Sequence, residues 1–279
     1  MEIREVGIKQ ILNPTSIGLG DYVINPYKGC EYSCLYCYVR FNKVTKRENR
    51  EWGTYIDARI NIPLILEREL LIKKPARVLL GSTTDCFQPI ELKYKLTKTI
   101  LETLNKYKIR YSILTRSPNA VKYIPVLSAG YLENIYFTVN SYSDRLKNLL
   151  EPKSPAFAAR ISAIKELQKQ NIPVIPYISP VLPFITDIEK IVPELPEFSN
   201  IGIEGLNFNL GNIEKIAELI AGIYPEHHDK YKKMMNDTGY YNDTWEKIKY
   251  NIEKLGKQYN KKFDIYIHGL KAYFNNKYT

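Results

Sequence analysis

The chain alternates between strand-like and helix-like stretches over most of its length, and this alternation restricts the folds that it can adopt. Short apolar runs are followed by segments in which apolar residues recur every three or four positions, as in amphipathic helices. Six runs are typical of strands: Tyr22–Ile24, Arg77–Leu80, Tyr111–Leu114, Ile135–Val139, Val174–Ile178 and Ile201–Asn207. Strands that alternate with helices in this way predict an α/β fold with a parallel sheet covered by helices.

Helical spacing of apolar residues lies between these strands. It extends from Ile62 to Leu70, from Leu96 to Leu104, over Ala120–Ser128, from Phe157 to Leu167 and over Thr186–Val192. The connections are short, and from the pattern alone an open doubly wound sheet and a full or partial barrel fit equally well.

After about residue 212 the pattern becomes mainly helical. Apolar side chains from Trp245 to Tyr259 fall on one face of a helix, and Phe263–Ile267 is typical of a last short strand. We therefore predict a core of residues 1–212 and a C-terminal, mainly helical extension of residues 213–279 packed on that core.

Three of the four cysteines lie within eight residues, in the segment NPYKGCEYSCLYCYVR. Cys30, Cys34 and Cys37 have C-x3-C-x2-C spacing, and thiolates at short spacings of this kind hold iron–sulfur clusters. Three thiolates can bind three irons of a [4Fe–4S] cube, which leaves the fourth iron open to a small molecule. Gly29 is expected to let the backbone approach such a group closely.

A zinc ion is the alternative occupant of this segment. Structural zinc takes four ligands, usually from two pairs spaced like C-x2-C. The remaining candidate ligands are scattered, at Cys86, His227, His228 and His268. Cys86 can complete a four-cysteine site in principle, but the compact triplet favours a cluster.

The composition is that of an ordinary globular protein, with 44% hydrophobic and 25% charged residues. No apolar run approaches the roughly 20 residues that a membrane span needs, and the charged N-terminus lacks the apolar centre of a signal peptide. Cysteines grouped in one window are not a disulfide framework and agree with a reducing compartment. We therefore expect a cytoplasmic protein with no membrane partner.

The formal net charge is +10, from 40 Lys and Arg against 30 Asp and Glu. A basic excess favours polyanionic partners such as DNA or other nucleic acid, and a Lys-rich surface that serves solubility accounts for it equally well. One basic group follows the cysteines directly and consists of Lys43, Lys46, Arg47 and Arg50.

The segment CEYSCLYC resembles the CxxxCxΦC signature of the radical SAM (S-adenosylmethionine) superfamily, with Tyr36 at the aromatic position Φ. The resemblance implies a [4Fe–4S] cluster on the three cysteines, with the amine and carboxylate of SAM chelating the open iron. It implies that the cluster, reduced by a donor such as flavodoxin or ferredoxin, cleaves SAM to a 5′-deoxyadenosyl radical that abstracts a substrate hydrogen atom. It also implies a barrel, so the expected fold is a partial (β/α)6 TIM-like barrel with a C-terminal helical extension.

Further blocks resemble the spore photoproduct lyase-related subgroup, which is described as DNA repair photolyase-like. They are STTDCFQPIE, ILTRS, FTVNS, EPKSPAFAARISAIKEL and SPVLPFITD, and with the cysteine segment they run from Asn25 to Asp187. By this resemblance Thr84, Arg116 and Thr138 match positions that contact SAM. Arg116 replaces the lysine expected in the family and can bind a carboxylate by paired hydrogen bonds.

Position in the predicted fold supports these residues, because active sites of βα barrels lie at the carboxyl ends of the strands. The residues predicted to bind the cofactor are Tyr36, Thr84, Asp85, Arg116, Thr138, Asn140 and Arg160. Thr84 and Asp85 have an alternative role at a strand end or helix cap, and Arg160 has one as a surface residue of a helix.

Cys86 and Tyr38 are the candidate hydrogen-atom donors. Photoproduct lyase uses a cysteine for this purpose, but the matching position in this sequence is Ser82. Cys86 follows Asp85 near the expected rim, and Tyr38 follows Cys37 directly. A lone cysteine is otherwise most often a small buried apolar residue.

Three functions follow from the sequence. The first is a photoproduct lyase-like enzyme of DNA repair, although Ser82 argues against photoproduct lyase itself. The second is a radical SAM enzyme that modifies RNA, a peptide or a small molecule. The third is a non-catalytic, zinc-binding nucleic-acid protein.

Overall fold

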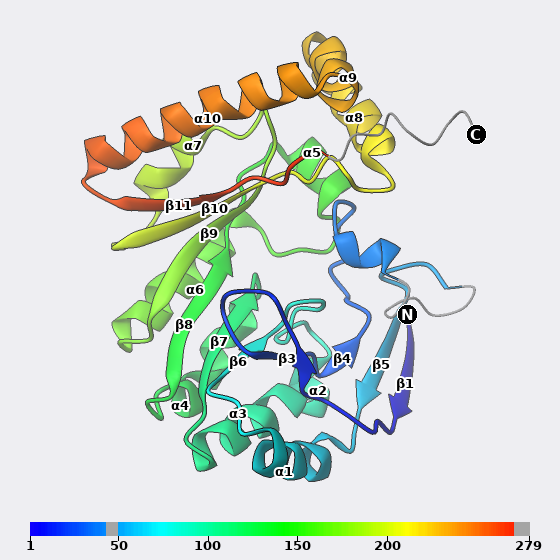
Figure 1. Ribbon diagram of the computed structural model, residues 1–279, viewed down its shortest axis with the longest axis vertical. Coiled ribbons are helices and arrows are strands. Elements are labelled where there is room, and N and C mark those ends of the chain that lie inside the picture. Colours follow the sequence, from blue (N-terminus) through cyan, green and yellow to red (C-terminus); the bar gives the residue numbers. More distant parts are fainter. Residues whose placement is uncertain (43–49, 271–279) are drawn as a thin grey trace.

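A curved parallel sheet dominates the computed structural model, which describes residues 1–42 and 50–270 (Figure 1). The strand order in this sheet is β11-β10-β9-β8-β7-β6-β3-β2, and all neighbours are parallel except β2 and β3. The strands are β2 (Asn13–Pro14), β3 (Tyr22–Ile24), β6 (Arg77–Leu80), β7 (Arg110–Thr115), β8 (Leu132–Thr138), β9 (Val174–Val181), β10 (Asn200–Gly205) and β11 (Lys262–Tyr266).

Each parallel strand lies beside the one that follows it in this sheet, as successive βα units require. The six strands predicted from the sequence are β3 and β6 to β10, and their order confirms the predicted α/β fold of the partial-barrel type. Because all these strands point the same way, their carboxyl ends meet at one rim.

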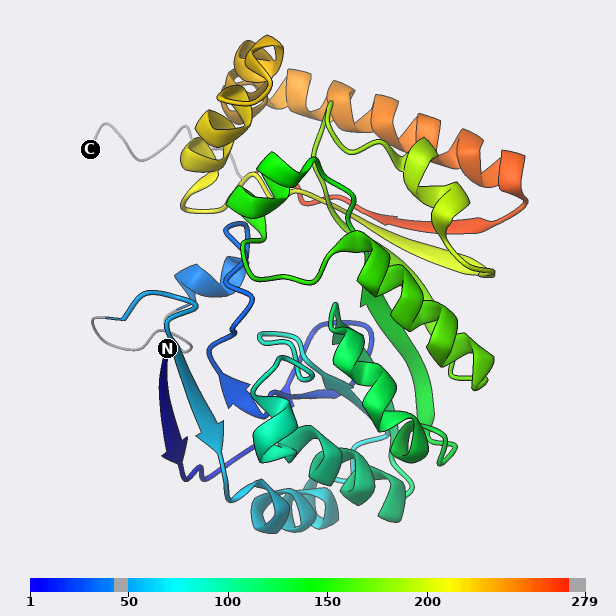
Figure 2. The ribbon, with the colours of Figure 1, turned by 180° about the vertical axis from the view of Figure 1, so that it is seen from behind.

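Helices cover the sheet on its outer side. Figure 2 shows α3 and α6 running across this face, and Figure 1 shows α10 lying along β11. The helices are α1 (Ile62–Lys73), α2 (Glu91–Tyr94), α3 (Leu96–Lys106), α4 (Ile124–Leu127), α5 (Asp144–Leu150), α6 (Phe157–Lys169), α7 (Ile188–Ile191), α8 (Ile213–Ala221), α9 (His228–Asn236) and α10 (Thr238–Tyr259). In the described ranges, no helix is both long enough and apolar enough to cross a membrane.

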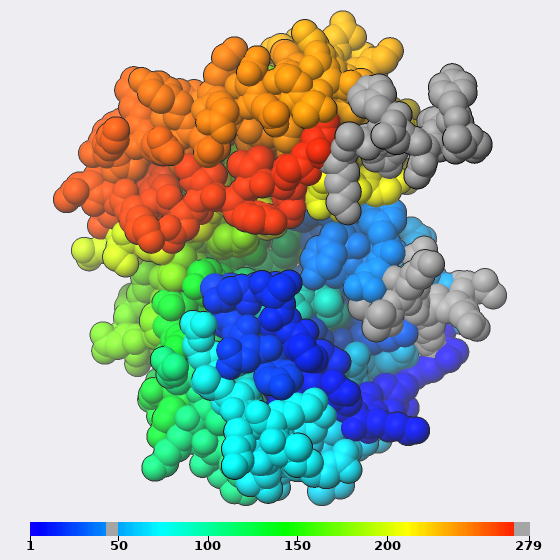
Figure 3. Space-filling model, in the orientation of Figure 1, coloured from blue at the N-terminus to red at the C-terminus, as the bar shows by residue number. Residues whose placement is uncertain are grey.

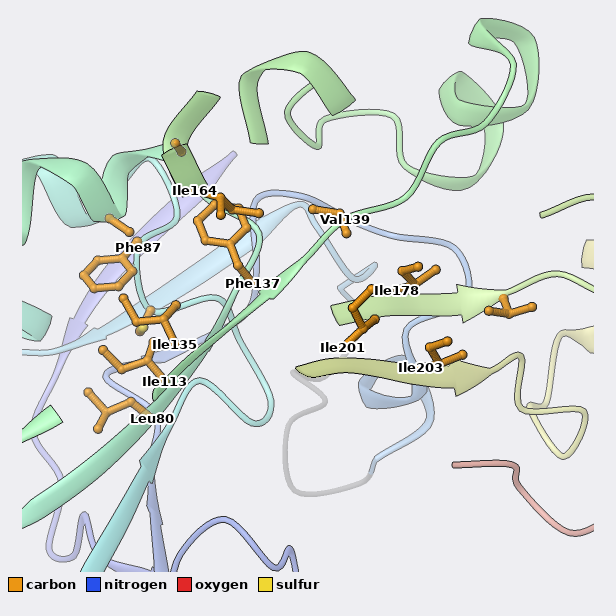
Figure 4. Packing of buried hydrophobic residues seen from close by; sticks show 14 of the residues in the cluster. Leu80, Phe87, Ile113, Ile135, Phe137, Val139, Ile164, Ile178, Ile201 and Ile203 are labelled. Carbon is orange, nitrogen blue, oxygen red and sulfur yellow. The ribbon is translucent and has the colours of Figure 1, made fainter. Parts of the chain in front are cut away.

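The core lies between the sheet and these helices. Figure 4 shows Leu80, Ile113 and Ile135 of three neighbouring strands in one layer, with Ile164 of α6 close to Phe137. All five side chains are fully buried. Near-continuous apolar strands of this kind are typical of a parallel sheet that is covered on both faces.

A second, small sheet was not predicted from the sequence. It has the order β1-β5-β4 and consists of β1 (Glu2–Val6), β4 (Tyr27–Lys28) and β5 (Tyr55–Arg59). β4 ends two residues before the first cysteine of the triplet, so this sheet supports the beginning of the cysteine loop.

The chain returns to the main sheet near its C-terminal end. After α10, β11 pairs in parallel with β10, and Lys262 lies opposite Asn200. The boundary between residues 212 and 213 stays a prediction.

A buried carboxylate ties α1 to the N-terminal segment. Glu69 accepts hydrogen bonds from the backbone nitrogens of Ile11 and Leu12, both at 2.8 Å, and its other oxygen lies 2.7 Å from Nζ of Lys73. Burial alone would raise the pKa of Glu69, but these contacts outweigh it and hold the pKa below the ordinary value of 4.5.

We expect Glu69→Gln to destabilise the protein at neutral pH by about 1.5–3 kcal/mol, the range for hydrogen bonds to a charged group. A carboxylate with a lowered folded pKa contributes its full stability above its ordinary pKa and loses it as the pH falls through the folded pKa. Urea unfolding at stepwise lower pH should therefore show that the difference in the free energy of unfolding between wild type and variant becomes smaller.

Glu67→Gln is the matched control, because this residue of the same helix pairs with Lys106 at the surface, where both side chains are exposed. It should change stability little at any pH. If the loss of stability in Glu69→Gln stays constant down to acid pH, the lowered pKa assigned to Glu69 is contradicted.

Candidate active site

The cysteine triplet occupies a loop that follows β4 and ends in a short 3-10 helix, Tyr38–Phe41. Backbone hydrogen bonds join Ser33 to Cys30 and Cys37 to Cys34, each at 3.3 Å, and fold the loop tightly. The cysteines are free thiols, and those of Cys30 and Cys34 are buried. Burial raises the pKa of Cys30 and Cys37, to about 11 for Cys37.

Gly29 serves the packing of this loop in a way that the sequence did not indicate. Its φ of +97° lies in the left-handed region, and a Cβ there would lie 2.1 Å from the carbonyl oxygen of Tyr55. The close approach that glycine permits is therefore to the backbone of β5.

Neighbouring segments hold the loop from several sides. The side-chain amide of Gln88 bonds to the backbone of Gly29 and Glu31. The nitrogen of Leu35 donates to the carbonyl of Leu150 at 2.8 Å, and the amide of Asn212 donates to the carbonyl of Leu35 at 2.9 Å. A segment after β6, the last residue of α5 and a segment after β10 thus fix the cysteine loop at the rim of the sheet.

A buried carboxylate, Glu151, lies behind the loop and pairs with two arginines. It has no exposed surface. One oxygen lies 3.1 Å from Nη1 of Arg116, and the other pairs with Arg160 of α6. Burial alone would raise the pKa of Glu151, but the charges of Arg160 and Arg116 outweigh it and lower the pKa to about 2. The group is therefore an anion that stabilises the buried Arg160 and the partly buried Arg116.

Arg116 connects this carboxylate to the cysteines. Its Nη1 also donates to Oη of Tyr36 at 2.7 Å and to Sγ of Cys34 at 3.3 Å. Its backbone nitrogen donates to Asp85 at 2.8 Å, which fixes the residue directly after β7. A second polar group, Oγ of Ser154, lies 3.5 Å from the same sulfur of Cys34.

Asn140 joins the same network from the end of β8. Its amide nitrogen donates to Glu151 at 2.8 Å, and its oxygen accepts from the backbone nitrogen of Ser179 at 3.1 Å. Asn140 therefore fixes β9 and the buried carboxylate relative to each other.

The structure brings four of the predicted cofactor residues together and leaves three outside this network. Tyr36, Arg116, Asn140 and Arg160 all contact Glu151. Thr84, Asp85 and Thr138 lie at the same rim and are buried. Thr84 donates to the carbonyl of Tyr27 at 3.5 Å, and Asp85 accepts from Thr115 and from backbone nitrogens.

The two candidate hydrogen donors have different surroundings. Cys86 has no exposed surface and packs in the main hydrophobic core. Tyr38 is 48% exposed, and its hydroxyl donates to the carbonyl of Ser82 at 2.8 Å. Although the residue is exposed overall, desolvation around its hydroxyl, with Cys37 and Glu204 nearby, raises the pKa of Tyr38 to about 12, so the phenol keeps its proton. The donor role stays a prediction for both, and exposure favours Tyr38.

The sequence did not single out Glu151, Ser154 or the pair formed by Glu204 and His268, whose side chains lie 3.0 Å apart. Glu151 and Ser154 lie in the EPKSP block, so the block was a signal, but nothing in it marks a buried ion pair. Of the basic group after the cysteines, Arg50 pairs with Glu2 at 2.7 Å, and Lys43, Lys46 and Arg47 lie outside the described residues.

A single metal ion and an iron–sulfur cluster place different demands on the three thiols. Across residues 1–42 and 50–270, no three His, Cys, Asp or Glu side chains converge closely enough to hold one ion. A zinc ion needs four ligands around one point, whereas in a [4Fe–4S] cube each thiolate binds its own iron.

Comparisons with known proteins agree with this geometry. The radical SAM superfamily model matches residues 24–192. An uncharacterised protein of Methanocaldococcus jannaschii is 30% identical over 241 residues, which are 86% of this chain and 89% of that protein.

Solved structures share the fold. A spore photoproduct lyase variant has a TM-score of 0.60 and 18% identity, covering 80% of this chain and 66% of the lyase. A second variant, solved with bound AdoMet (SAM) and dinucleoside spore photoproduct, has a TM-score of 0.58 and 17% identity over the same shares. SuiB of Streptococcus suis, bound to its precursor peptide, has a TM-score of 0.51 and 12% identity, covering 88% and 48%. This chain thus spans just under two thirds of the lyase.

We expect Glu151→Gln to destabilise the protein by about 3–5 kcal/mol, the range for removing one partner of a buried ion pair. The variant keeps the size of the side chain but leaves the buried guanidinium of Arg160 and the partly buried one of Arg116 without their anion. Urea unfolding of the cofactor-free protein measures the loss.

The control is Glu133→Gln, because Glu133 also lies 3.1 Å from an arginine, Arg110, but there the arginine is exposed and the carboxylate is only partly buried. Surface pairs contribute little, so this variant should unfold much like wild type. Equal losses of stability for the two variants would show that the burial of Glu151 does not determine how much its ion pairs contribute to the free energy of unfolding.

Proposed function

Because the chain belongs to the radical SAM superfamily, we propose that Cys30, Cys34 and Cys37 hold a [4Fe–4S] cluster whose open iron binds SAM. The observation that carries this proposal is the triplet of free thiols in a loop fixed at the carboxyl ends of the parallel strands. When bound and reduced by one electron, the cluster would supply the cleavage of SAM to methionine and a 5′-deoxyadenosyl radical, which takes a hydrogen atom from substrate.

The residues around Cys34 suit a thiolate ligand. A cysteine sulfur bound to iron has no proton, so Arg116 and Ser154 must both donate to it. Hydrogen bonds to cluster sulfurs stabilise the reduced, more negative state and set the reduction potential. We assign this tuning to the two side chains.

Arg116 is the proposed partner of the SAM carboxylate. A guanidinium has five N–H donors, and the hydrogen bonds that this side chain makes with the described residues come from Nη1. Asp85 holds the backbone of Arg116 and Arg160 holds Glu151, so both are proposed as positioning residues. Four further residues at the rim are proposed to contact SAM. Thr84, Thr138 and Asn140 are proposed from their sequence match or position, and the fourth is Tyr36.

Tyr38 is the proposed hydrogen-atom donor. It follows a cluster cysteine, it reaches the surface of the rim, and its hydroxyl contacts the backbone of Ser82. A serine hydroxyl is a poor hydrogen-atom donor, whereas a phenol is a good one. The exposed tyrosine can therefore take the role that a cysteine at the Ser82 position has in photoproduct lyase.

Nucleic acid is the proposed substrate class, with a flavodoxin- or ferredoxin-type protein as the electron donor. The net charge of +10 favours a polyanion. Spore photoproduct lyase, which has a similar fold, has been solved with a dinucleoside photoproduct. SuiB, also similar in fold, has been solved with a peptide, so a peptide is the second candidate substrate.

Anaerobic reconstitution with iron and sulfide, followed by reduction and incubation with SAM, tests the proposal. We expect a four-iron cluster and formation of 5′-deoxyadenosine and methionine. Cys34→Ser should lose both. A fully loaded and reduced protein that forms no 5′-deoxyadenosine contradicts the enzyme assignment, and zinc without iron or sulfide supports a zinc-binding protein instead.

The same assay separates the candidate donors once an oligonucleotide substrate turns over. Tyr38→Phe should form 5′-deoxyadenosine but change the product distribution, because the substrate radical lacks its donor. Cys86→Ala, in the core, should leave both unchanged. The reverse outcome would assign the role to Cys86.

We further expect Ser154→Ala to shift the midpoint potential of the reconstituted cluster to a more negative value, as followed by electron paramagnetic resonance during a redox titration. Ser154→Thr keeps the hydroxyl and should retain the wild-type potential. Ser112→Ala, the same change at a buried position of β7, controls for altered packing. An unchanged potential in Ser154→Ala, or an equal shift in Ser112→Ala, argues against the hydrogen bond.

A further inference from the structure

A hollow of about 370 Å³ lies beside the short helix that ends the cysteine loop. Tyr38 and Phe41 line it from the cysteine loop, and Asn207, Tyr266 and His268 line it from segments at the ends of β10 and β11. Figure 3 shows that the surface is hollowed between the red end of β11 and the light-blue segment after the cysteines. The proposed hydrogen donor, Tyr38, is therefore part of its wall.

Three aromatic rings line this hollow and remain open to solvent. Tyr38, Phe41 and Tyr266 are 48%, 40% and 58% exposed. Phe41 is also held in place, because a Cβ at Gly211 would lie only 3.0 Å from two atoms of its ring. Exposed apolar surface gathered at one place marks a binding site, and aromatic faces are the surfaces on which nucleic-acid bases stack.

An oriented imidazole adds a polar edge to this aromatic wall. Nε2 of His268 lies 3.0 Å from one oxygen of Glu204, whose other oxygen accepts from Ser179 at 2.6 Å and from Tyr177 at 3.3 Å. Burial alone would raise the pKa of Glu204, but the hydrogen bonds from His268 and Ser179 outweigh it and lower the pKa. Since the carboxylate is charged, Nε2 donates to it, which makes Nδ1 an acceptor in the neutral ring.

We propose that this hollow binds a nucleobase of a nucleic-acid substrate, stacked against the aromatic wall and hydrogen-bonded to His268. The inference rests on the proposed function, because that function includes nucleic acid as the substrate class. The hollow falls in the size range of ligand pockets. Recognition of splayed-out bases by stacking and by their hydrogen-bonding edges is the common mode for single strands.

The test uses the full-length, reconstituted protein and two single-stranded oligodeoxynucleotides. One carries 2-aminopurine at a single position, and the other carries an abasic site there. We expect quenched 2-aminopurine fluorescence and about tenfold tighter binding of the strand with the base, the effect of one stacked base. Phe41→Ala and His268→Gln should lose this preference but keep wild-type affinity for the abasic strand, which reports backbone contacts alone.

His228→Ala is the control, because His228 lies on α9 and is exposed. It should behave as wild type. The proposal is overturned if the two strands bind equally, if both hollow variants keep the full preference, or if saturating SAM abolishes it, since the adenine of SAM would then occupy the hollow. Binding of a peptide but of neither strand also overturns it. Formation of 5′-deoxyadenosine needs no oligonucleotide, so the proposed function and this inference fail separately.

Discussion

The buried carboxylate of Glu151 is the contact on which the geometry of the site depends. It forms ion pairs with Arg116 and Arg160, and it accepts hydrogen bonds from Tyr36 and Asn140. Those partners come from the cysteine loop, the ends of β7 and β8, and α6, so one anion sets the relative positions of four parts of the fold. A guanidinium group such as that of Arg160 is expensive to bury without such a partner. The network therefore holds the cysteine loop against the sheet.

Two groups of side chains surround the cysteine loop. Arg116 and Ser154 contact the sulfur of Cys34, which suits the proposed tuning of a cluster and the proposed binding of a charged cofactor. Tyr38 and Phe41, from the short helix that ends the loop, line the hollow that His268 also lines. The proposed cofactor contacts and the proposed substrate contacts therefore come from different residues around one loop.

The sequence predicted the sheet because its strands are short, apolar and separated by helical spacing, whereas β1 and β5 were missed because their pairing joins distant and partly exposed segments. The predicted cluster site rests on the spacing of the three cysteines. Glu151 and the pair of Glu204 and His268 could not be predicted, because their partners come from other elements of the fold. Asp85 and Cys86 show a further limit of prediction from the sequence. The side chain of Asp85 lies at the rim and that of its neighbour Cys86 lies in the core, and the sequence does not indicate which of the two faces the rim.

The central claim is that three cysteines leave one iron of a cluster open to SAM. Electron–nuclear double resonance on the reduced, reconstituted protein tests it most directly, with SAM labelled by nitrogen-15 at the methionyl amine. We predict a coupling to the labelled nitrogen strong enough to require a bond to iron, together with a changed electron paramagnetic resonance spectrum when SAM is added. A fully loaded cluster whose spectrum is the same with and without SAM, and which shows no such coupling, would contradict the account.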